Sequence, residues 1–259
     1  MAVEAIDINC DMGEGFGAWQ LRETDDEALI KLISSANIAT GFHAGDPSLM
    51  DRTVRMAAEH GVGVGAHPGY RDLQGFGRRR IDGSTAELVN DIVYQVGAIR
   101  EFAKRHGAHL QHVKPHGALY MELASNTEFS DAFVRYMRAV QPETAIFCMG
   151  VSATYEIAKA AGQPVIREFY ADRDYGDDGA IVFTRRVGRL DPEAVAAKVV
   201  KACLNGTVTT VTGKEVDVQF ESICFHSDTL GSKEIVEAMR CRLKENGVRV
   251  VPVSKLLGR

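Results

Sequence analysis

The chain has 259 residues, 45% of them hydrophobic, and a formal net charge of −5. This composition suffices for a packed core, and the absence of a basic stripe leads us to expect no nucleic-acid partner. No apolar run reaches the roughly 18–20 residues of a membrane span, and we expect neither a membrane segment nor a signal peptide. The five scattered cysteines include no C-x-x-C pair, so we expect a reduced, cytoplasmic protein.

Short apolar runs alternate with stretches of helical periodicity, a pattern typical of βα units and a parallel sheet. The expected strands are Ala5–Cys10, Asn37–Thr40, Val62–Ala66, Leu110–Lys114, Ala145–Met149, Pro164–Phe169, Ser222–His226 and Arg249–Val253. The expected helices include Asp25–Ser35, Ser48–His60, Ser84–His106, Asp191–Leu204 and Ser232–Asn246. Seven or eight parallel strands in a chain of this length favour an α/β, TIM-like barrel over an open sheet.

Local signals support several element ends. Ser84 and Glu87 have the spacing of a capping box, and Gly247 follows the last long helix as a helix-ending glycine. The segment Gly206–Phe220 has the pattern of a β-hairpin that turns at Gly213-Lys214. We therefore expect residues 1–259 to form a single barrel domain, with a hairpin excursion near residues 206–220.

Clusters of reactive polar residues follow the ends of six expected strands. They are Asn9–Trp19, Gly41–Pro47, His67–Arg79, His112–Tyr120, Glu168–Tyr175 and Phe225–Thr229. Parallel strands present their carboxyl ends at one edge of a barrel, where the active sites of such enzymes lie. Alternation along the first strand places Asp7, Asn9 and Asp11 on the face that we expect to line the lumen.

Asp11, His43 and His67 end three successive strands, so we expect them to be neighbours. One carboxylate and two imidazoles can hold a divalent metal, with water completing the shell. Alternatively, Asp11 acts as a general base without a metal. Gly63 and Gly65 share a face with His67, which predicts open volume below that histidine for a small ligand.

Lys114 lies late in a strand, between His112 and His116. Its ammonium could hold an oxyanion or phosphate, or the amine could act as a base if desolvated. Alternatively, the side chain could snorkel to solvent. Pro115 and Gly117 indicate a fixed turn, which favours a role in the site. We expect His116 to protonate a leaving nitrogen and His112 to be a packed core histidine.

His226 and Asp228 could form an imidazole–carboxylate pair, although Asp228 could equally cap the next helix. Arg79 follows the glycine-rich segment Gly75–Gly77 and could grip a carboxylate. The residues expected to bind substrate are Asn9, Glu14, Arg79, Glu168, Asp172, His226 and Asp228.

Several catalytic motifs are absent from the sequence, including G-x-x-x-x-G-K-[ST], G-x-S-x-G and H-E-x-x-H. A serine hydrolase and a self-contained P-loop ATPase are therefore poor interpretations. Hydrolysis by an activated water molecule is better supported.

The clusters NCDMGEGFGAW, GFHAGDP, HPGYRDLQGFGRR, HVKPHGALY and ADRDY occur in an order that resembles the LamB/YcsF family from about Ile6 to Val253. The resemblance implies a seven-stranded barrel related to the glycoside hydrolase/deacetylase group. It also implies ATP-dependent opening of the lactam 5-oxo-L-proline to L-glutamate, as the A subunit of a 5-oxoprolinase with partner subunits B and C.

This chain departs from the family pattern at two places. Thr40 stands where the family commonly has Cys, and Ser227 and Leu230 replace Gly and Pro in the last block. We expect Asp11 to activate water, Lys114 to stabilise the developing oxyanion or phosphate, and the partners to supply most of the phosphoryl-transfer apparatus. The alternative is a metal-dependent deacetylase or amidohydrolase that needs no ATP.

Overall fold

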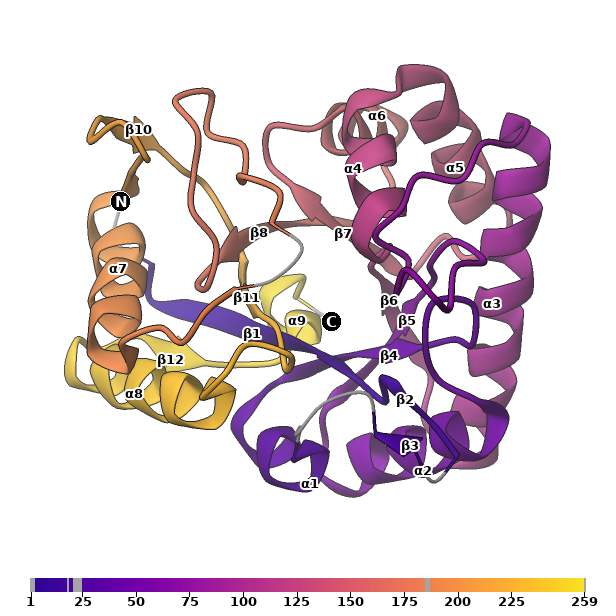
Figure 1. Ribbon diagram of the computed structural model, residues 1–259, viewed down its shortest axis with the longest axis horizontal. Helices are drawn as coiled ribbons and strands as arrows, with labels where there is room; N and C mark the ends of the chain where they lie inside the picture. Colours follow the sequence, from indigo (N-terminus) through magenta and orange to yellow (C-terminus); the bar gives the residue numbers. More distant parts are fainter. Residues whose placement is uncertain (1–2, 18, 21–24, 185–186, 259) are drawn as a thin grey trace.

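The computed structural model describes residues 3–17, 19–20, 25–184 and 187–258. Within this part of the chain, seven parallel strands close into a barrel, which confirms the predicted fold class (Figure 1). In order around the barrel, they are β1 (Ala5–Met12), β4 (Ser35–Ala39), β5 (Gly63–His67), β6 (Leu110–Val113), β7 (Ala145–Met149), β8 (Val165–Tyr170) and β11 (Ser222–Phe225). Strand β1 closes the barrel because it pairs with β4 and also with β11.

Helices surround the barrel (Figure 1). The longer ones are α2 (Pro47–Glu59), α3 (Thr85–Arg105), α4 (Gly117–Ser125), α5 (Thr127–Val140), α6 (Ala153–Ala161), α7 (Pro192–Asn205) and α8 (Ser232–Glu245). The predicted capping box of Ser84 and Glu87 starts α3, and Gly247 has a φ of 75° just after α8. None of the described helices combines the length and apolar character needed to cross a membrane.

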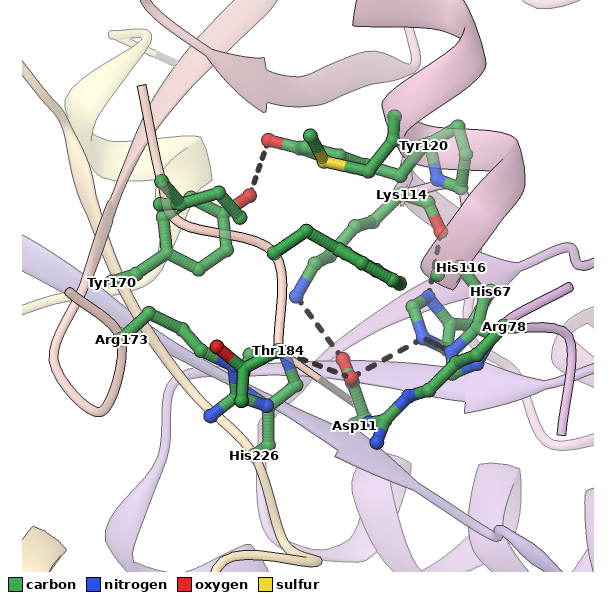
Figure 2. A pocket seen from close by; sticks show the side chains of 15 residues that line it. Asp11, His67, Arg78, Lys114, His116, Tyr120, Tyr170, Arg173, Thr184 and His226 are labelled. Carbon is green, nitrogen blue, oxygen red and sulfur yellow. Dashed lines mark hydrogen bonds and ion pairs between the residues drawn. The ribbon is translucent and has the colours of Figure 1, made fainter. Parts of the chain in front are cut away.

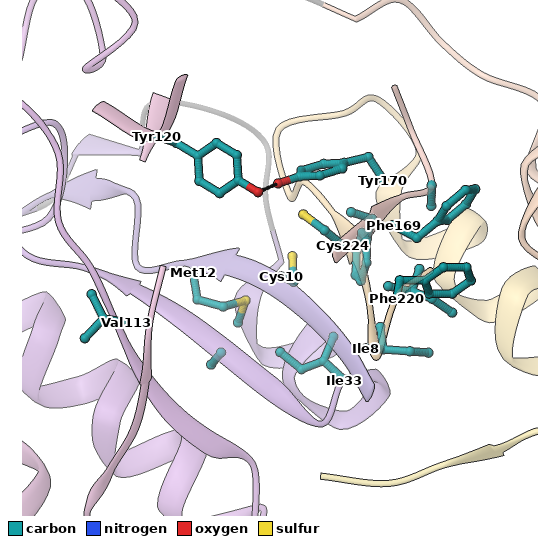
Figure 3. Close-up of a cluster of buried hydrophobic side chains, with 14 of the residues drawn as sticks. Ile8, Cys10, Met12, Ile33, Val113, Tyr120, Phe169, Tyr170, Phe220 and Cys224 are labelled. Carbon is teal, nitrogen blue, oxygen red and sulfur yellow. Dashed lines mark hydrogen bonds between the residues drawn. The ribbon is translucent and has the colours of Figure 1, made fainter. Parts of the chain in front are cut away.

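The two faces of β1 divide the barrel into an apolar shell and a polar lumen. Its buried apolar side chains are Ile6, Ile8, Cys10 and Met12, and Figure 3 shows part of this cluster. On the other face, the Asp7 carboxylate accepts hydrogen bonds from Ser34, Ser35 and Ser222. These donors offset the cost of burying the carboxylate, although burial still raises the pKa of Asp7 to about 6.

The expected helix Asp25–Ser35 is wrong in its second half. Helix α1 covers only Asp26–Leu29, a 3₁₀ turn covers Ile30–Leu32, and Ser35 already belongs to β4. Ser35 pairs in register with Asn9 of the neighbouring strand β1, so strand pairing overrides the local helical pattern.

The expected strand Arg249–Val253 is also shorter than predicted. Strand β12 (Arg249–Val250) pairs only with Ala5 and Ile6, before the part of β1 that pairs with β11. The following helix, α9 (Val253–Leu256), packs Val253 against Phe147 and other residues of β7 and β8.

The open volume expected below His67 is absent from the described part of the lumen. A Cβ atom at Gly65 would lie 2.0 Å from His112 Nε2, and one at Gly63 would lie 2.2 Å from Gln111 Oε1. These glycines therefore admit neighbouring side chains and leave no ligand space. His112 is fully buried, stacks on Phe147 and contacts Asn37 Oδ1 at 2.7 Å, as expected for a core histidine.

Two antiparallel hairpins extend from the barrel. Strands β9 (Thr207–Thr209) and β10 (Glu215–Asp217) form the predicted excursion, with Gly213 at a φ of 85° in the turn. Strands β2 (Gly15–Phe16) and β3 (Trp19–Gln20) lie within the first polar cluster, of which Ala18 lies outside the described residues.

Candidate active site

A pocket opens at the carboxyl ends of the barrel strands (Figure 2). Its wall includes Asp11 from β1, His67 from β5, Lys114 after β6, Tyr170 from β8 and His226 after β11. Sequence-distant clusters thus meet because each follows a parallel strand. The backbone past β8 supplies further wall residues, among them Ile181, Phe183 and Thr184.

Lys114 lies at the centre of a buried charge network and is only 3% exposed. Its Nζ lies 3.1 Å from Asp11 Oδ1 and 3.3 Å from Glu168 Oε1, and it donates to Asn9 Oδ1 at 3.2 Å. The contact with Glu168 is an ion pair that lacks hydrogen-bond geometry, because Oε1 has no hydrogen-bond partner among the described atoms. Cys224 Sγ lies 3.0 Å away on another side. Lys114 therefore does not snorkel to solvent.

This network sets the charge states of its members. Burial opposes ionisation of Asp11, but the charges of His67 and Lys114 outweigh it and hold the pKa of Asp11 well below its usual range. Burial also opposes charge on Lys114, but Asp11 and Glu168 help to raise the pKa of Lys114 well above its usual value. The pocket thus presents an ammonium that stays protonated and cannot serve as a base.

Two tyrosines complete the surroundings of Glu168. Tyr120 and Tyr170 donate hydrogen bonds to Glu168 Oε2 at 3.1 and 3.0 Å, and their hydroxyl groups also contact each other. Both tyrosines line the pocket, whereas Asn9 lies below Lys114 and does not. The sequence analysis did not assign either tyrosine to the site. Tyr120 ends the cluster His112–Tyr120, and Tyr170 lies two residues after Glu168, on the same face of β8.

Glu14, His43, His67 and His116 form the group of described residues that could hold a metal ion, with one ligand atom of each within 4.8 Å of the others. This set replaces the expected one, because Glu14 and His116 join it and Asp11 does not. Asp11 Oδ2 lies 3.3 Å from His67 Nε2, at the edge of the group. Burial is the main cause that lowers the pKa of His43 and of His116, so both rings are neutral at pH 7.

The expected role of His116 as an acid does not fit its contacts. Its Nε2 lies 2.8 Å from the Phe76 carbonyl oxygen and its Nδ1 lies 2.9 Å from His67 Nε2. Both ring nitrogens therefore already face protein groups, although part of the side chain lines the pocket.

His226 pairs with Asp172, and not with Asp228 as expected. His226 Nδ1 lies 3.0 Å from Asp172 Oδ1, and Thr229 donates to Oδ2 of the same carboxylate. The other ring nitrogen, Nε2, lies 3.8 Å from Asp11 Oδ2. Burial and then the charge of Arg173 lower the pKa of His226 to about 4, despite the nearby Asp172. His226 is therefore a neutral imidazole with its outer nitrogen directed toward Asp11.

Asp228 does not cap α8 either, since Gly231 holds the cap position without a side-chain hydrogen bond. Instead, Asp228 Oδ2 accepts a hydrogen bond from Arg78 Nη2 at 2.9 Å. Arg78 and Asp228 are 150 residues apart in the chain, so the residues around Asp228 could not indicate this partner.

Of the two neighbouring arginines Arg78 and Arg79, the one expected in the site lies outside the pocket. Arg79 is 54% exposed in its side chain, pairs with Asp72 and does not line the pocket. Arg78 does line it and is buried, as is Arg173, which pairs with Asp172 at 2.9 Å. Both arginines lie inside clusters identified from the sequence, but only the folded backbone shows which of two adjacent arginines points inward.

A sequence model of the LamB/YcsF family matches residues 6–258. The chain belongs to the LamB/YcsF family. It is 58% identical over 245 residues to a 5-oxoprolinase A subunit of Pseudomonas aeruginosa, across 95% of this chain and 97% of that protein. A Pseudomonas putida protein of the same name is 54% identical over 248 residues, across 96% and 98%.

A solved structure supports this LamB/YcsF assignment. A lactam utilization protein from Thermus thermophilus superposes with a TM-score of 0.88 at 36% identity, and the match covers 95% of this chain and 99% of that one. The family match also spans the pocket, since residues 6–258 include every cluster from Asn9 to Thr229.

Proposed function

We propose that this LamB/YcsF protein hydrolyses 5-oxo-L-proline to L-glutamate in an ATP-dependent reaction, as the A subunit of a 5-oxoprolinase that also contains subunits B and C. The names of the Pseudomonas relatives support the substrate and the subunit role. The chain is thus a hydrolase acting on the C–N bond of a cyclic amide. The requirement for ATP and the five unpaired cysteines favour a cytoplasmic location.

The observation that carries the proposal is the buried Lys114 ammonium, held between Asp11 and Glu168 in a pocket that also contains a His226–Asp172 pair. This pocket combines a buried positive charge with a neutral imidazole base. Hydrolysis of an unreactive carbonyl group requires both groups. The positive charge stabilises the negative oxygen that develops, and the base takes a proton from the attacking water.

ATP is chemically reasonable because amide resonance makes a five-membered lactam a poor electrophile. Transfer of a phosphoryl group to the lactam oxygen would give a reactive, imidate-like species. Water adds to its ring carbon, and cleavage of the C–N bond leaves an acyl phosphate. A second water molecule hydrolyses that acyl phosphate to glutamate and phosphate. The chain carries no recognisable nucleotide motif, so the partner subunits supply most of the phosphoryl-transfer apparatus.

His226 is the better base in this scheme, and Asp11 assists it. His226 Nδ1–H donates to Asp172, which leaves the Nε2 lone pair free to take a proton from water. Asp11, 3.8 Å from that nitrogen, accepts a hydrogen bond from the same water and orients it. The resulting imidazolium returns the proton to the ring nitrogen as the C–N bond breaks. Lys114 stabilises the negative oxygen or phosphate that faces it.

The carboxylate of 5-oxoproline needs a cationic partner in the pocket. Arg78 and Arg173 are buried there and replace Arg79 in this role. Arg78 pairs with Asp228 and Arg173 pairs with Asp172, and these ion pairs help to orient the two guanidinium groups. A guanidinium group has five N–H donors in a planar fork, so it can contact a substrate carboxylate as well as a protein carboxylate.

Reconstitution tests the proposal. The purified chain is combined with candidate B and C subunits, and glutamate release from 5-oxoproline is followed with ATP present or withheld. We expect release only in the complete mixture with ATP, and we expect Asp11→Asn to abolish it while the surface variant Asp131→Asn does not. Asp131 is a suitable control because it pairs with Arg135 on the exposed face of α5.

Two results would contradict the proposal. Release of acetate from an N-acetyl sugar by the isolated chain, without nucleotide, would establish the deacetylase alternative. Unchanged turnover at saturating substrate in both Asp11→Asn and Lys114→Met would mean that this chain only binds the lactam and that the partners do the chemistry.

A further inference from the structure

Two histidine nitrogens face each other inside the barrel mouth. His67 Nδ1 lies 2.7 Å from the carbonyl oxygen of Lys114, and His116 Nε2 lies 2.8 Å from that of Phe76. A carbonyl oxygen can only accept, so each of these nitrogens carries a hydrogen. The opposite nitrogens, His67 Nε2 and His116 Nδ1, lie 2.9 Å apart. If both rings are neutral, these nitrogens present lone pairs that repel each other unless a proton or a metal ion lies between them, and Asp11 Oδ2, 3.3 Å from His67 Nε2, could also accept such a proton.

Two further ligand atoms converge at the same point. Glu14 Oε1 lies 3.1 Å from His43 Nε2, 3.5 Å from His116 Nδ1 and 3.9 Å from His67 Nε2. A shared proton would satisfy the two facing nitrogens, but it would not account for a third imidazole and a carboxylate gathered around them. We propose that Glu14, His43, His67 and His116 bind one divalent metal ion of the zinc class, and that Asp11 lies outside the ligand set.

The spacing of the ligand atoms fits such an ion. Zinc binds nitrogen and oxygen at about 2.0–2.1 Å, so a tetrahedral site separates its ligand atoms by about 3.3 Å. The four separations given above range from 2.9 to 3.9 Å and bracket this value. Because the rings of His43 and His116 are stacked and nearly parallel, one of them has to turn on binding so that the ion lies near the plane of both rings.

The surrounding structure packs closely around the histidine rings. His43 stacks on His116 with ring centres 3.8 Å apart and an interplanar angle of 5°. Gly69 and Gly77 pack directly against these rings, because a Cβ atom at Gly69 would lie 2.5 Å from His43 Nδ1 and one at Gly77 would lie 2.8 Å from His116 Cδ2. Backbone carbonyls hold the outer nitrogens of His67 and His116. Histidine ligands of metals usually have such outer hydrogen bonds.

The chemistry of the donors selects the class of metal. Three imidazoles and one carboxylate suit zinc, cobalt or nickel, whereas magnesium and calcium prefer oxygen ligands. A bound ion would supply positive charge to polarise an oxygen in the adjoining pocket, which His67 and His116 also line. This inference goes beyond the proposed function, which assigns no metal. It can be tested on the isolated chain, because metal binding is measured without turnover or partner subunits.

The test uses the full chain, stripped with a chelator and checked for folding by circular dichroism. Zinc binding is followed by titration calorimetry and by metal analysis after gel filtration, and cobalt serves as the spectroscopic probe. We expect one ion per chain and a cobalt absorption spectrum typical of a four- or five-coordinate site with nitrogen ligands.

Variants distinguish the ligand set proposed here from one that includes Asp11. Glu14→Gln should weaken zinc binding at least about tenfold, and His116→Ala should weaken it more. Asp11→Asn should bind zinc within about threefold of the unmodified chain. His60→Ala is the matched control, since His60 is an exposed histidine at the end of α2 whose ring contacts only the Met56 carbonyl among the described residues.

The proposal is overturned if the folded, unmodified chain binds neither zinc nor cobalt. It is also overturned if folded Glu14→Gln and His116→Ala bind zinc as tightly as His60→Ala does, or if Asp11→Asn loses the ion as Glu14→Gln is expected to. Should the ligand variants fail to fold, the stoichiometry and the cobalt spectrum of the unmodified chain decide the question. Failure to release glutamate in the reconstituted system would bear on the proposed function and leave these binding results unaffected.

Discussion

Replacing Lys114 with methionine tests whether the buried ammonium holds the site together. At an effective dielectric constant of about 20, each ion pair, at 3.1 Å to Asp11 and 3.3 Å to Glu168, contributes an attraction of about 5 kcal/mol. Removing the ammonium also removes the cost of burying it, which is several kcal/mol. We therefore expect a net loss of about 3–5 kcal/mol in the free energy of unfolding, the usual cost of leaving a buried carboxylate unpaired.

The loss should depend on pH in a definite direction. The lowered pKa of Asp11 stabilises the folded chain above the unfolded value of about 3.9, and the raised pKa of Lys114 stabilises it below about 10.4. The unmodified pair thus contributes fully at both pH 5 and pH 8. In Lys114→Met, Asp11 loses this cation and binds protons more tightly, so the variant becomes less stable as the pH rises. The difference between the two proteins should be larger at pH 8 than at pH 5.

Urea unfolding followed by circular dichroism, with chelator present to exclude bound metal, measures this difference. Lys104→Met is the control, because Lys104 is an exposed lysine of α3 whose ammonium pairs with Glu101 at 2.9 Å. The control should lose at most about 1 kcal/mol. The reasoning is refuted if Lys114→Met costs no more than Lys104→Met, or if its cost is the same at both pH values.

Three further predictions concern the base and the lumen. Asp172→Asn should lower kcat about 10³–10⁴-fold in the reconstituted system, because the amide no longer fixes the His226 tautomer, and a loss below tenfold would argue against that role. For the unmodified complex, kcat/KM should fall as the pH drops through about 4, because His226 then becomes protonated. A fall in kcat/KM already near pH 6.5 would contradict the assignment of His226 as the base. Gly65→Ala should cost about 1–3 kcal/mol in urea unfolding, because its Cβ atom would collide with His112, whereas Gly97→Ala, with open space in α3, should stabilise the chain by about 0.5–1 kcal/mol. Equal effects of the two glycine variants would show that the lumen is not tightly packed.

Much of the barrel could be predicted because its signals are local. Alternation in β1 separates the lumen residues from the shell, and the Ser84–Glu87 capping box and Gly247 mark helix ends within a few residues. Local signals failed where pairing with another strand decides the backbone. Ser35 is extended because it pairs with Asn9 of β1, and the helical pattern of the neighbouring residues could not show that.

The sequence was enough to predict which segments hold the polar, reactive residues, because strand ends and polar clusters are local features of a chain. It was also enough to predict that these segments meet at one edge of a parallel barrel. Which side chains pair with each other at that edge depended on the tertiary structure. It paired His226 with Asp172, placed Arg78 inward and Arg79 outward, and grouped Glu14 with three histidines. Such choices depend on side-chain directions and on contacts between residues far apart in the chain, which strand spacing does not encode.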